Sequence, residues 1–201
     1  MTAGNKNFFD KAACSYTNPW MKSKKAEKKV RKIAGRFGIK KGMSIVEAGC
    51  GNGEFTRFII ERAGENGNIC LVDSSRRMLL KAKKRMKHNK DIKYRNRCVT
   101  KTGIKGKSAD MVVCFNSFPH FYPKEKTLKE FRRVLKDKGA LVISHDINIS
   151  TINRMHGEIG FNMKKHRMPL KGEMKEILGK TGFKMVSYTN NSYYLLKAKK
   201  I

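Results

Sequence analysis

The stretch VEAGCGNGEF, residues Val46–Phe55, decides the fold, because it links a predicted strand to a predicted helix. Residues 43–49 form a short apolar run typical of a buried strand, and residues 53–64 carry the apolar spacing of a helix. The glycines of the turn stand at alternate positions: Gly49, Gly51 and Gly53. Such a turn lets backbone amides and a helix start approach a ligand closely, so it indicates a nucleotide-cofactor site.

Strands and helices are expected to alternate along the rest of the chain. The predicted strands cover residues 67–73, 91–98, 109–117 and 140–146, and the predicted helices cover residues 21–37, 74–87, 123–139 and 170–182. Two last strands, residues 183–189 and 192–199, are separated by hairpin spacing and should pair antiparallel. This order predicts a doubly wound α/β sheet of seven strands in a single domain over residues 1–201, with helices on both faces.

The charge of the chain is unusual for a small domain. Lys and Arg number 46 against 16 Asp and Glu, which gives a formal net charge of +30. Much of the excess lies in two segments, residues 21–41 and 76–97. Such a field attracts polyanions or small acidic substrates, although lysine-rich helix faces can also serve only to keep a protein in solution. The charge is therefore evidence about partners and not about chemistry.

The sequence does not indicate a membrane protein, a secreted protein, a disulfide framework or a metal site. No apolar run is long enough to span a bilayer, and the amino terminus lacks the apolar core of a secretory signal, so we expect a cytoplasmic protein without a membrane partner. The five cysteines are scattered and include no C-x-x-C pair, as expected of reduced thiols. The histidine spacings match no standard ligand motif, so no metal site is predicted.

The glycine spacing narrows the choice of cofactor. In the dinucleotide fingerprint the third glycine comes three places after the second, whereas here it comes two places after. Glu47 precedes the first glycine by two residues, and Asp73 ends the next predicted strand in CLVDSS. Two further stretches are informative: FFDKAACSYTNPW at residues 8–20 and FRRVLKDKGALVIS at residues 131–144. In these features the chain resembles, over essentially its whole length, the small-molecule type of class I S-adenosylmethionine-dependent methyltransferase, which has a Rossmann-like sheet with one reversed strand.

The resemblance implies that S-adenosylmethionine is the cofactor. It implies that Glu47 holds the amino end of the methionine moiety, that the glycine turn holds its carboxylate and that Asp73 accepts the ribose hydroxyls. Many relatives carry an acid at the end of strand three, where this chain has Cys98 and Val99, so adenine would depend on backbone groups and apolar packing. The expected cofactor-binding residues are Tyr16, Glu47, Gly49, Cys50, Gly51, Gly53, Asp73, Ser74, Met78, Cys98, Val99, Asn116 and Ser117.

The acceptor pocket should lie beyond the carboxyl ends of strands four and five. Four of the five histidines follow those strands: His120, His145, His156 and His166. We expect His120, His145 or His156 to act in acid–base chemistry or acceptor binding, with residues 145–170 as a substrate lid and residues 1–37 as an amino-terminal cap and helix. The alternative is that these histidines face solvent and that His166 belongs to the basic run KKHR.

Three functions remain open. The opening segment of small-molecule type favours a methyltransferase for a small, anionic acceptor. The charge also fits a nucleic acid partner, which makes an RNA methyltransferase using the basic surface the main alternative. A non-catalytic regulatory module that binds the cofactor without turnover is the second alternative. The sequence does not indicate an oligomeric state.

Overall fold

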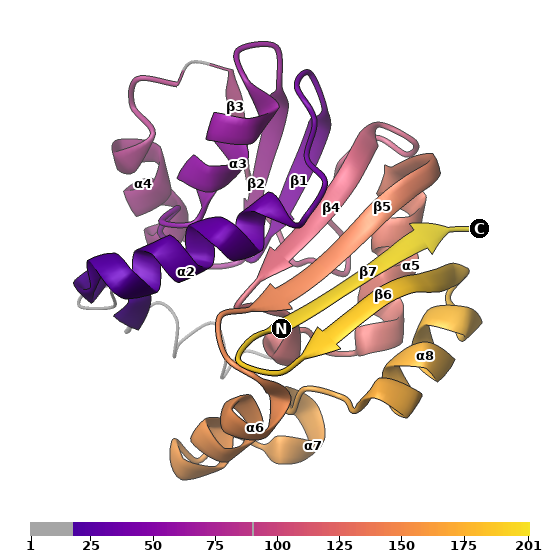
Figure 1. Cartoon of the computed structure of the whole chain (residues 1–201). Helices are drawn as coiled ribbons and strands as arrows, with labels where there is room; N and C mark the ends of the chain where they lie inside the picture. Colours follow the sequence, from indigo (N-terminus) through magenta and orange to yellow (C-terminus); the bar gives the residue numbers. More distant parts are fainter. Residues whose placement is uncertain (1–17, 90) are drawn as a thin grey trace.

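The computed structural model describes residues 18–89 and 91–201, which form a seven-stranded sheet with the strand order β3-β2-β1-β4-β5-β7-β6 (Figure 1). β7 runs antiparallel to both β5 and β6, while the pairs from β3 to β5 are parallel. The strands are β1 (Ser44–Ala48), β2 (Asn68–Asp73), β3 (Ile92–Asn96), β4 (Ala109–Phe115), β5 (Leu135–His145), β6 (Phe183–Asn190) and β7 (Tyr194–Lys200). This Rossmann-like sheet with one reversed strand confirms the predicted fold class.

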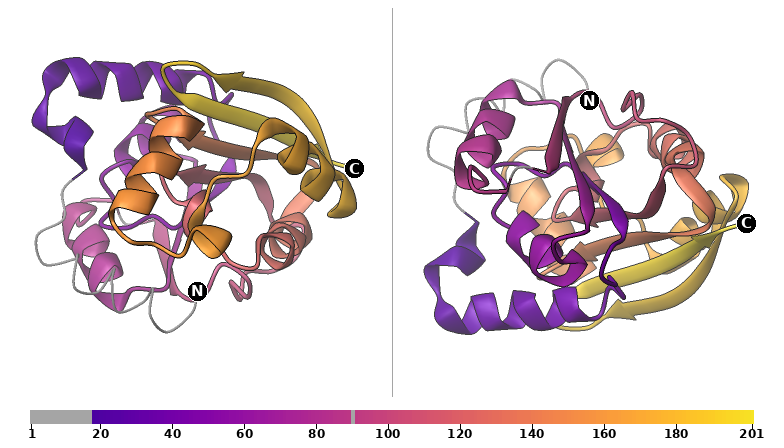
Figure 2. Two further views of the ribbon diagram at one scale, coloured as in Figure 1. Left: turned by 90° about the horizontal axis from the view of Figure 1, so that it is seen from below. Right: turned by 90° about the horizontal axis from the view of Figure 1, so that it is seen from above.

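Helices pack on both faces of the sheet, and Figure 2 shows the layers from two sides. Buried side chains of α2, α3 and α4 join one hydrophobic cluster, and those of α5 and α8 join the cluster on the opposite face. The helices are η1 (Pro19–Lys22), α2 (Lys24–Gly35), α3 (Thr56–Ala63), α4 (Arg76–Arg85), η2 (Phe118–His120), α5 (Lys124–Val134), α6 (Ile149–Glu158), α7 (Met163–His166) and α8 (Lys171–Lys180), where η is a 3-10 helix. The short helices α6 and α7 follow the carboxyl end of β5, beyond the sheet (Figure 1).

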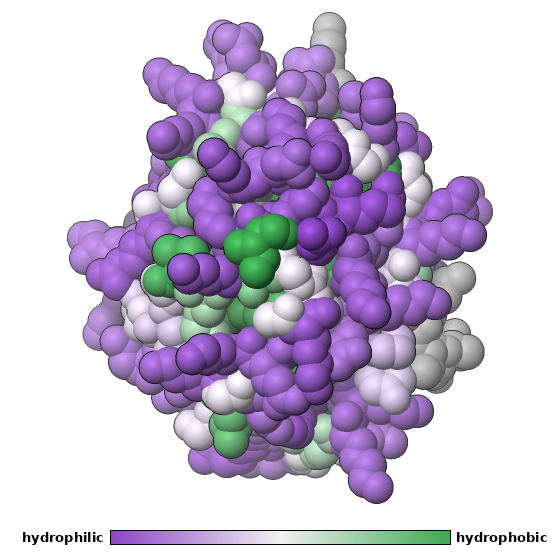
Figure 3. Space-filling view, turned by 90° about the vertical axis from the view of Figure 1, so that its right-hand side faces the viewer, coloured by the Kyte–Doolittle hydropathy of each residue, from purple (hydrophilic) through white to green (hydrophobic). Residues whose placement is uncertain are grey.

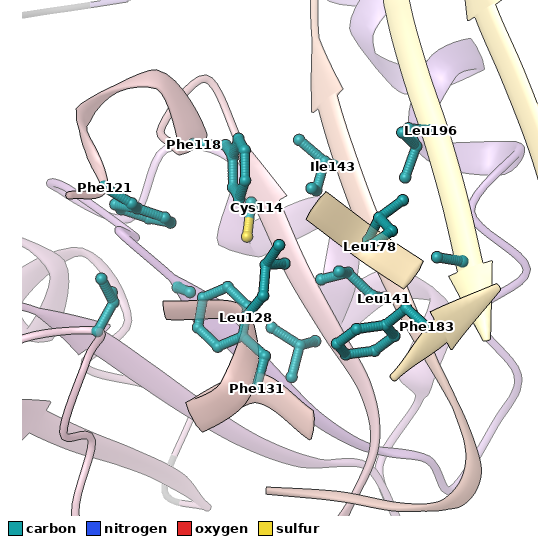
Figure 4. Close-up of a cluster of buried hydrophobic side chains, with 14 of the residues drawn as sticks. Cys114, Phe118, Phe121, Leu128, Phe131, Leu141, Ile143, Leu178, Phe183 and Leu196 are labelled. Atoms are coloured by element: carbon teal, nitrogen blue, oxygen red, sulfur yellow. The ribbon is translucent and has the colours of Figure 1, made fainter. Parts of the chain in front are cut away.

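The central strands are buried because helices cover both faces of the sheet. In β4 every residue from Met111 to Phe115 is buried, which explains why its sequence is a continuous apolar run. Figure 4 shows the cluster under α5 and α8, where Cys114 of β4 lies among Phe118, Leu128 and Leu178. This core fixes the ends of β4 and β5, from which the candidate acceptor region extends.

The predicted helix over residues 123–139 is too long. α5 ends at Val134, and Leu135 already pairs with Ala109 as the first residue of β5. The strand pairing then shifts register before Met111, and Lys138 takes a left-handed φ of 62° within the resulting irregularity. The Lys-Asp-Lys-Gly run is hydrophilic and continues the helical pattern in sequence, but burial of Leu135 against β4 sets the boundary.

The amino-terminal helix starts later than predicted. Residues Pro19–Lys22 form the 3-10 turn η1, and Ser23 then caps α2 by accepting a hydrogen bond from the Ala26 amide at 3.4 Å. The helix packs on the sheet through one apolar side, since Val30 and Ile33 are buried in the same cluster as residues of the strands.

Polar side chains dominate the surface that Figure 3 shows, with hydrophobic residues in small separate patches. In residues 18–89 and 91–201, none of the helices combines the length and the apolar character needed to cross a bilayer.

Candidate active site

The glycine turn and the end of β2 meet at one edge of the sheet because β1 and β2 are parallel neighbours. The Gly49 amide donates to the carbonyl oxygen of Val72 at 2.8 Å. The Asp73 carboxylate accepts from the Gly51 amide at 2.9 Å through Oδ2 and from the Ser75 amide at 2.8 Å through Oδ1. Asp73 therefore ties the glycine turn to the start of α4, and the structure brings together two of the residues expected to hold the cofactor.

Gly51 leaves open space at this edge. Its φ is 55°, and among the described residues no heavy atom lies within 4 Å of a Cβ built on it. Residues 18–89 and 91–201 thus leave room for a ligand against the backbone of Gly51, whose amide is bonded to Asp73. Cys50, the neighbouring residue, is buried at 7% exposure and lies on the side of the core formed with α2 and α3.

Glu47 is a buried acid under the same turn. It is 2% exposed, and its Oε2 accepts a hydrogen bond of 2.7 Å from the hydroxyl of Thr56, the first residue of α3. Burial, with a smaller contribution from the negative charge of Asp73, raises the pKa of Glu47 from 4.5 to about 8, although the Thr56 bond opposes this. Without a bound ligand the Glu47 carboxyl is therefore largely protonated at neutral pH.

We expect the free energy of unfolding to fall as the pH rises from about 5 to 8, because of Glu47. A group whose folded pKa lies above its unfolded pKa stabilises the fold fully below the unfolded value, and this contribution is lost as the pH rises through the folded value. The slope from one such group is about 1.4 kcal/mol per pH unit at most. Urea unfolding of the wild type and Glu47→Gln across this range measures it. Equal slopes for the two proteins would contradict the assignment.

The ends of β4 and β5 are joined by polar side chains. The Ser117 hydroxyl donates to the Ala48 carbonyl at 2.9 Å, which fixes the segment after β4 against the start of the glycine turn. Asn116, with a left-handed φ of 52°, donates from Nδ2 to Asp146 Oδ1 at 2.9 Å and accepts from the Asp146 amide at 3.2 Å. The sequence interpretation missed Asp146, although a polar residue directly after strand five was a usable signal.

The end of β3 differs from the prediction. β3 ends at Asn96, and the Asn96 amide nitrogen donates to the carbonyl oxygens of Asp73 at 3.1 Å and Ser74 at 3.0 Å. Cys98 lies beyond the strand, with its sulfur 3.2 Å from the Thr100 hydroxyl oxygen, and Val99 is buried at 1% exposure in the core. At the end of β3, the amide side chain of Asn96 thus holds the backbone that follows β2.

Of the remaining residues expected to bind the cofactor, Met78 and Gly53 are described by the structure. Met78 lies in the first turn of α4, where its amide donates to the Ser75 hydroxyl at 3.2 Å, and its side chain is buried. Gly53 begins the segment leading into α3 and would bring a Cβ within 3.1 Å of Ala82. Tyr16 lies outside the described residues.

Histidines from separate elements gather beyond the ends of β4 and β5. The ring centroids of His120 in η2 and His156 in α6 are 4.7 Å apart, and those of His120 and His166 in α7 are 5.9 Å apart. Phe161 packs among them, with its centroid 5.2–5.3 Å from all three rings. His145, the last residue of β5, is buried at 5% exposure. We call His120, His156, His166 and Phe161 the histidine cluster.

The family follows from comparison of the chain with known proteins. Residues 45–139, from β1 through the start of β5, match the family model described as a methyltransferase domain. The chain therefore carries a methyltransferase domain, and its sheet has the Rossmann-like fold of the class I S-adenosylmethionine-dependent enzymes. S-adenosylmethionine is accordingly the cofactor, and the open glycine turn beside Asp73 fits it.

A curated relative and two solved structures are similar to this chain, which spans less than two thirds of the curated relative, and the two structures share its fold. The uncharacterized protein MJ0638 of Methanocaldococcus jannaschii is 30% identical over 162 residues, which cover 80% of this chain and 63% of that protein. A SAM-dependent methyltransferase from Aquifex aeolicus has a TM-score of 0.72 at 19% identity, with 86% of this chain and 89% of that chain covered. A chain in the complex of the Haloferax volcanii Trm112 methyltransferase activator has a TM-score of 0.79 at 15% identity, with coverages of 96% and 97%.

The four histidines beyond β4 and β5 have pKa values below the usual 6.5. Burial lowers the pKa of His120, His156 and His166 below 6.5, and in each case neighbouring basic groups lower it further. Burial lowers the pKa of His145 to about 3, and its Nε2 is buried with no hydrogen-bond partner among the described residues. His145 is therefore a poor base, since an effective base has a pKa near the working pH.

His156 has a defined orientation. Its Nδ1 lies 2.7 Å from the carbonyl oxygen of His166, so Nδ1 carries the hydrogen and Nε2 is the basic nitrogen. His166, which the sequence alternative placed in a surface run, is 4% exposed and belongs to the cluster. No signal in the local sequence marked it, because its neighbours are lysines and arginine. Within the described ranges, no set of three His, Cys, Asp or Glu side chains is arranged to hold a metal ion.

Proposed function

We propose that this methyltransferase transfers the methyl group of S-adenosylmethionine to a small-molecule acceptor, which binds beyond the carboxyl ends of β4 and β5. The observation that carries the proposal is the histidine cluster. Three elements that follow β4 and β5 assemble it, at the same edge of the sheet as the glycine turn after β1. Residues 145–170 would act as the substrate lid and residues 1–37 as the cap and first helix of a single domain.

Methyl transfer from a sulfonium is an in-line displacement in which positioning supplies most of the rate. A base is needed only when the acceptor atom starts protonated, and a well-placed imidazole then contributes about 10²–10⁴-fold. His156 is the best candidate base, because its Nδ1 is anchored to a backbone carbonyl and its side chain is only partly buried. His145 and His120 are more deeply buried and would shape the pocket.

The basic surface supports RNA as a second candidate acceptor. Exposed lysines and arginines cover the outer sides of two helices on one face of the sheet, and they include Lys24, Lys25, Lys28 and Lys32 of α2 and Arg76, Arg77, Lys81, Lys83 and Lys84 of α4. Such a surface binds polyanions through counterion release whatever the chemistry of the site. It therefore favours contact with RNA without indicating a base-specific pocket.

The fate of a labelled methyl group separates the candidate functions. The full chain is incubated with methyl-labelled S-adenosylmethionine and a protein-free cell extract, and the products are divided by size and by sensitivity to ribonuclease. We expect label in the small-molecule fraction, since the proposed pocket is built for a small acceptor. Label only in ribonuclease-sensitive material would replace the proposal with RNA methylation. Cofactor binding without labelled product would favour a regulatory module.

A further inference from the structure

Basic side chains crowd one edge of the sheet. Residues 76–97, which include α4 and the edge strand β3, contain eleven Lys and Arg and one acid, Asp91. β3 is the outermost strand at the end of the sheet opposite β6, and α4 packs beside it (Figure 1). Six exposed side chains of this region form what we call the basic edge: Lys83, Lys84, Lys87, Lys93, Arg95 and Arg97.

The basic edge wraps around β3. Lys83 and Lys84 lie on the outer side of α4, whose inner side is buried in the core. Along β3, Ile92 is buried in the same hydrophobic cluster as that helix. Because successive side chains of a strand point to opposite faces, the exposed Lys93 and Arg95 point to the other face of the sheet. An extended polyanion that follows this rim therefore meets basic groups on both sides of it.

Solubility alone does not account for this concentration of charge, because interspersed charges of both signs serve that purpose. Elsewhere basic side chains are balanced locally, as in the ion pairs Arg31–Glu61 and Lys180–Glu176. In residues 18–89 and 91–201, no carboxylate forms an ion pair with a side chain of the basic edge. The first turn of α4 even carries Arg76, where the helix dipole disfavours a cation. The excess of positive charge therefore points to an anionic partner.

A membrane surface does not fit as this partner. A helix that lies in a bilayer interface needs an exposed apolar side. The apolar residues of α4 are buried against the sheet, namely Met78, Leu79 and Ala82, and only Leu80 is exposed. The helix thus offers charge to its surroundings without the apolar face that would hold it in lipid.

A single strand of nucleic acid fits better. Its phosphates lie at regular intervals, and their condensed counterions are released when lysine or arginine neutralises them. Guanidinium groups such as those of Arg95 and Arg97 also stack on unpaired bases. Single-stranded RNA offers both phosphates and open base faces, whereas a DNA duplex keeps its base faces stacked inside.

We propose that the basic edge binds single-stranded RNA at a site apart from the acceptor pocket. In the sheet, β2, β1 and β4 stand between β3 and β5, which places the two strands about 20 Å apart at about 5 Å per strand. The histidine cluster follows β4 and β5, so RNA held on the basic edge lies away from it. The inference goes beyond the proposed function, because it assigns a docking partner and needs no methyl transfer to that partner.

A fluorescent oligouridylate of about 20 nucleotides is a suitable probe, because it is unpaired and longer than a typical single-strand site. The full chain is titrated into it, and fluorescence anisotropy gives Kd at sodium chloride concentrations from about 50 to 200 mM. The slope of log Kd against log salt concentration reports the phosphates that are neutralised, at about 0.7 per phosphate of a single strand. Contacts from the six side chains of the basic edge should give a slope of about 4 or more. A DNA duplex of the same length is titrated in parallel.

Two matched triple variants locate the site. Combined Lys83→Gln, Lys84→Gln and Lys87→Gln should raise Kd for the oligouridylate about tenfold or more and lower the salt slope by about 2. The control removes the same charge from the opposite face, where three exposed lysines of α5 and α8 are changed to Gln: Lys126, Lys129 and Lys175. The control should bind the oligouridylate nearly as the wild type does, and both variants should keep their affinity for S-adenosylhomocysteine.

Equal losses in the two variants would overturn the proposal, because they would trace binding to net charge and not to the basic edge. Absence of oligouridylate binding, or tighter binding of the DNA duplex, would overturn it as well. The labelled-methyl experiment tests the proposed function separately, since RNA binding needs no turnover.

Discussion

Replacement of Asp73 by Ala is expected to weaken S-adenosylmethionine binding by about 2–4 kcal/mol, or roughly 30- to 1,000-fold in Kd. The family resemblance gives this carboxylate the ribose hydroxyls. In the structure its two oxygens also accept from the Gly51 and Ser75 amides, so it shapes the glycine turn before any ligand arrives. The variant loses both the direct contact and the ordering of the turn, which is why a large effect is expected from one residue.

Two further variants make this prediction specific. Asp73→Asn keeps one acceptor oxygen and should lose less affinity than Asp73→Ala. Asp110→Ala is the matched control, because Asp110 also caps a backbone amide, that of Ser44 at 2.8 Å, but does so at the start of β4 and away from the turn. Asp110→Ala should lower stability and leave Kd unchanged when measured by calorimetry. If Asp73→Ala binds the cofactor as tightly as the wild type, the ribose role is wrong.

The sheet could be predicted from sequence because its signals are local. Buried parallel strands are short apolar runs, and the closing hairpin is marked by the few residues between β6 and β7. The boundary between α5 and β5 at Leu135 was predicted wrongly because a contact between residues distant in sequence sets it. There the deciding interaction is the pairing of Leu135 with Ala109, which the hydrophilic run around it does not indicate.

In the candidate site, too, some features could be predicted from the sequence and others depend on contacts between distant segments. The glycine turn and Asp73 follow two consecutive strands, so their meeting at one sheet edge could be inferred from the order of elements. The place of His166 could not be inferred, because α7 brings it to His120 only when the segment after β5 folds back on η2. The raised pKa of Glu47 depends on full burial, which sequence pattern does not measure.

Gly49 and Gly51 allow a comparison of equal substitutions in one turn. Both have positive φ, 69° and 55°, so an added Cβ costs about 1–2 kcal/mol in either place. At Gly49 the new Cβ would also stand 2.7 Å from Cβ of Ser117 and 3.0 Å from the Phe121 ring, both in the buried segment after β4. Overpacking of this kind adds about 1–3 kcal/mol. Gly49→Ala should therefore lower the free energy of unfolding by about 2–5 kcal/mol in total.

Gly51→Ala should lower stability less than Gly49→Ala but weaken cofactor binding. Its Cβ meets no neighbour among the described residues, so the loss of stability stays near the backbone cost, but the methyl group would stand where the ligand is expected to approach the backbone. We expect Kd for S-adenosylmethionine to rise about tenfold or more, because backbone and ligand can no longer approach closely. Urea unfolding and calorimetry on both variants test this. If Gly51→Ala binds the cofactor normally, then the ligand does not lie against this turn. If Gly51→Ala is less stable than Gly49→Ala, then the packing assigned to the two glycines is wrong.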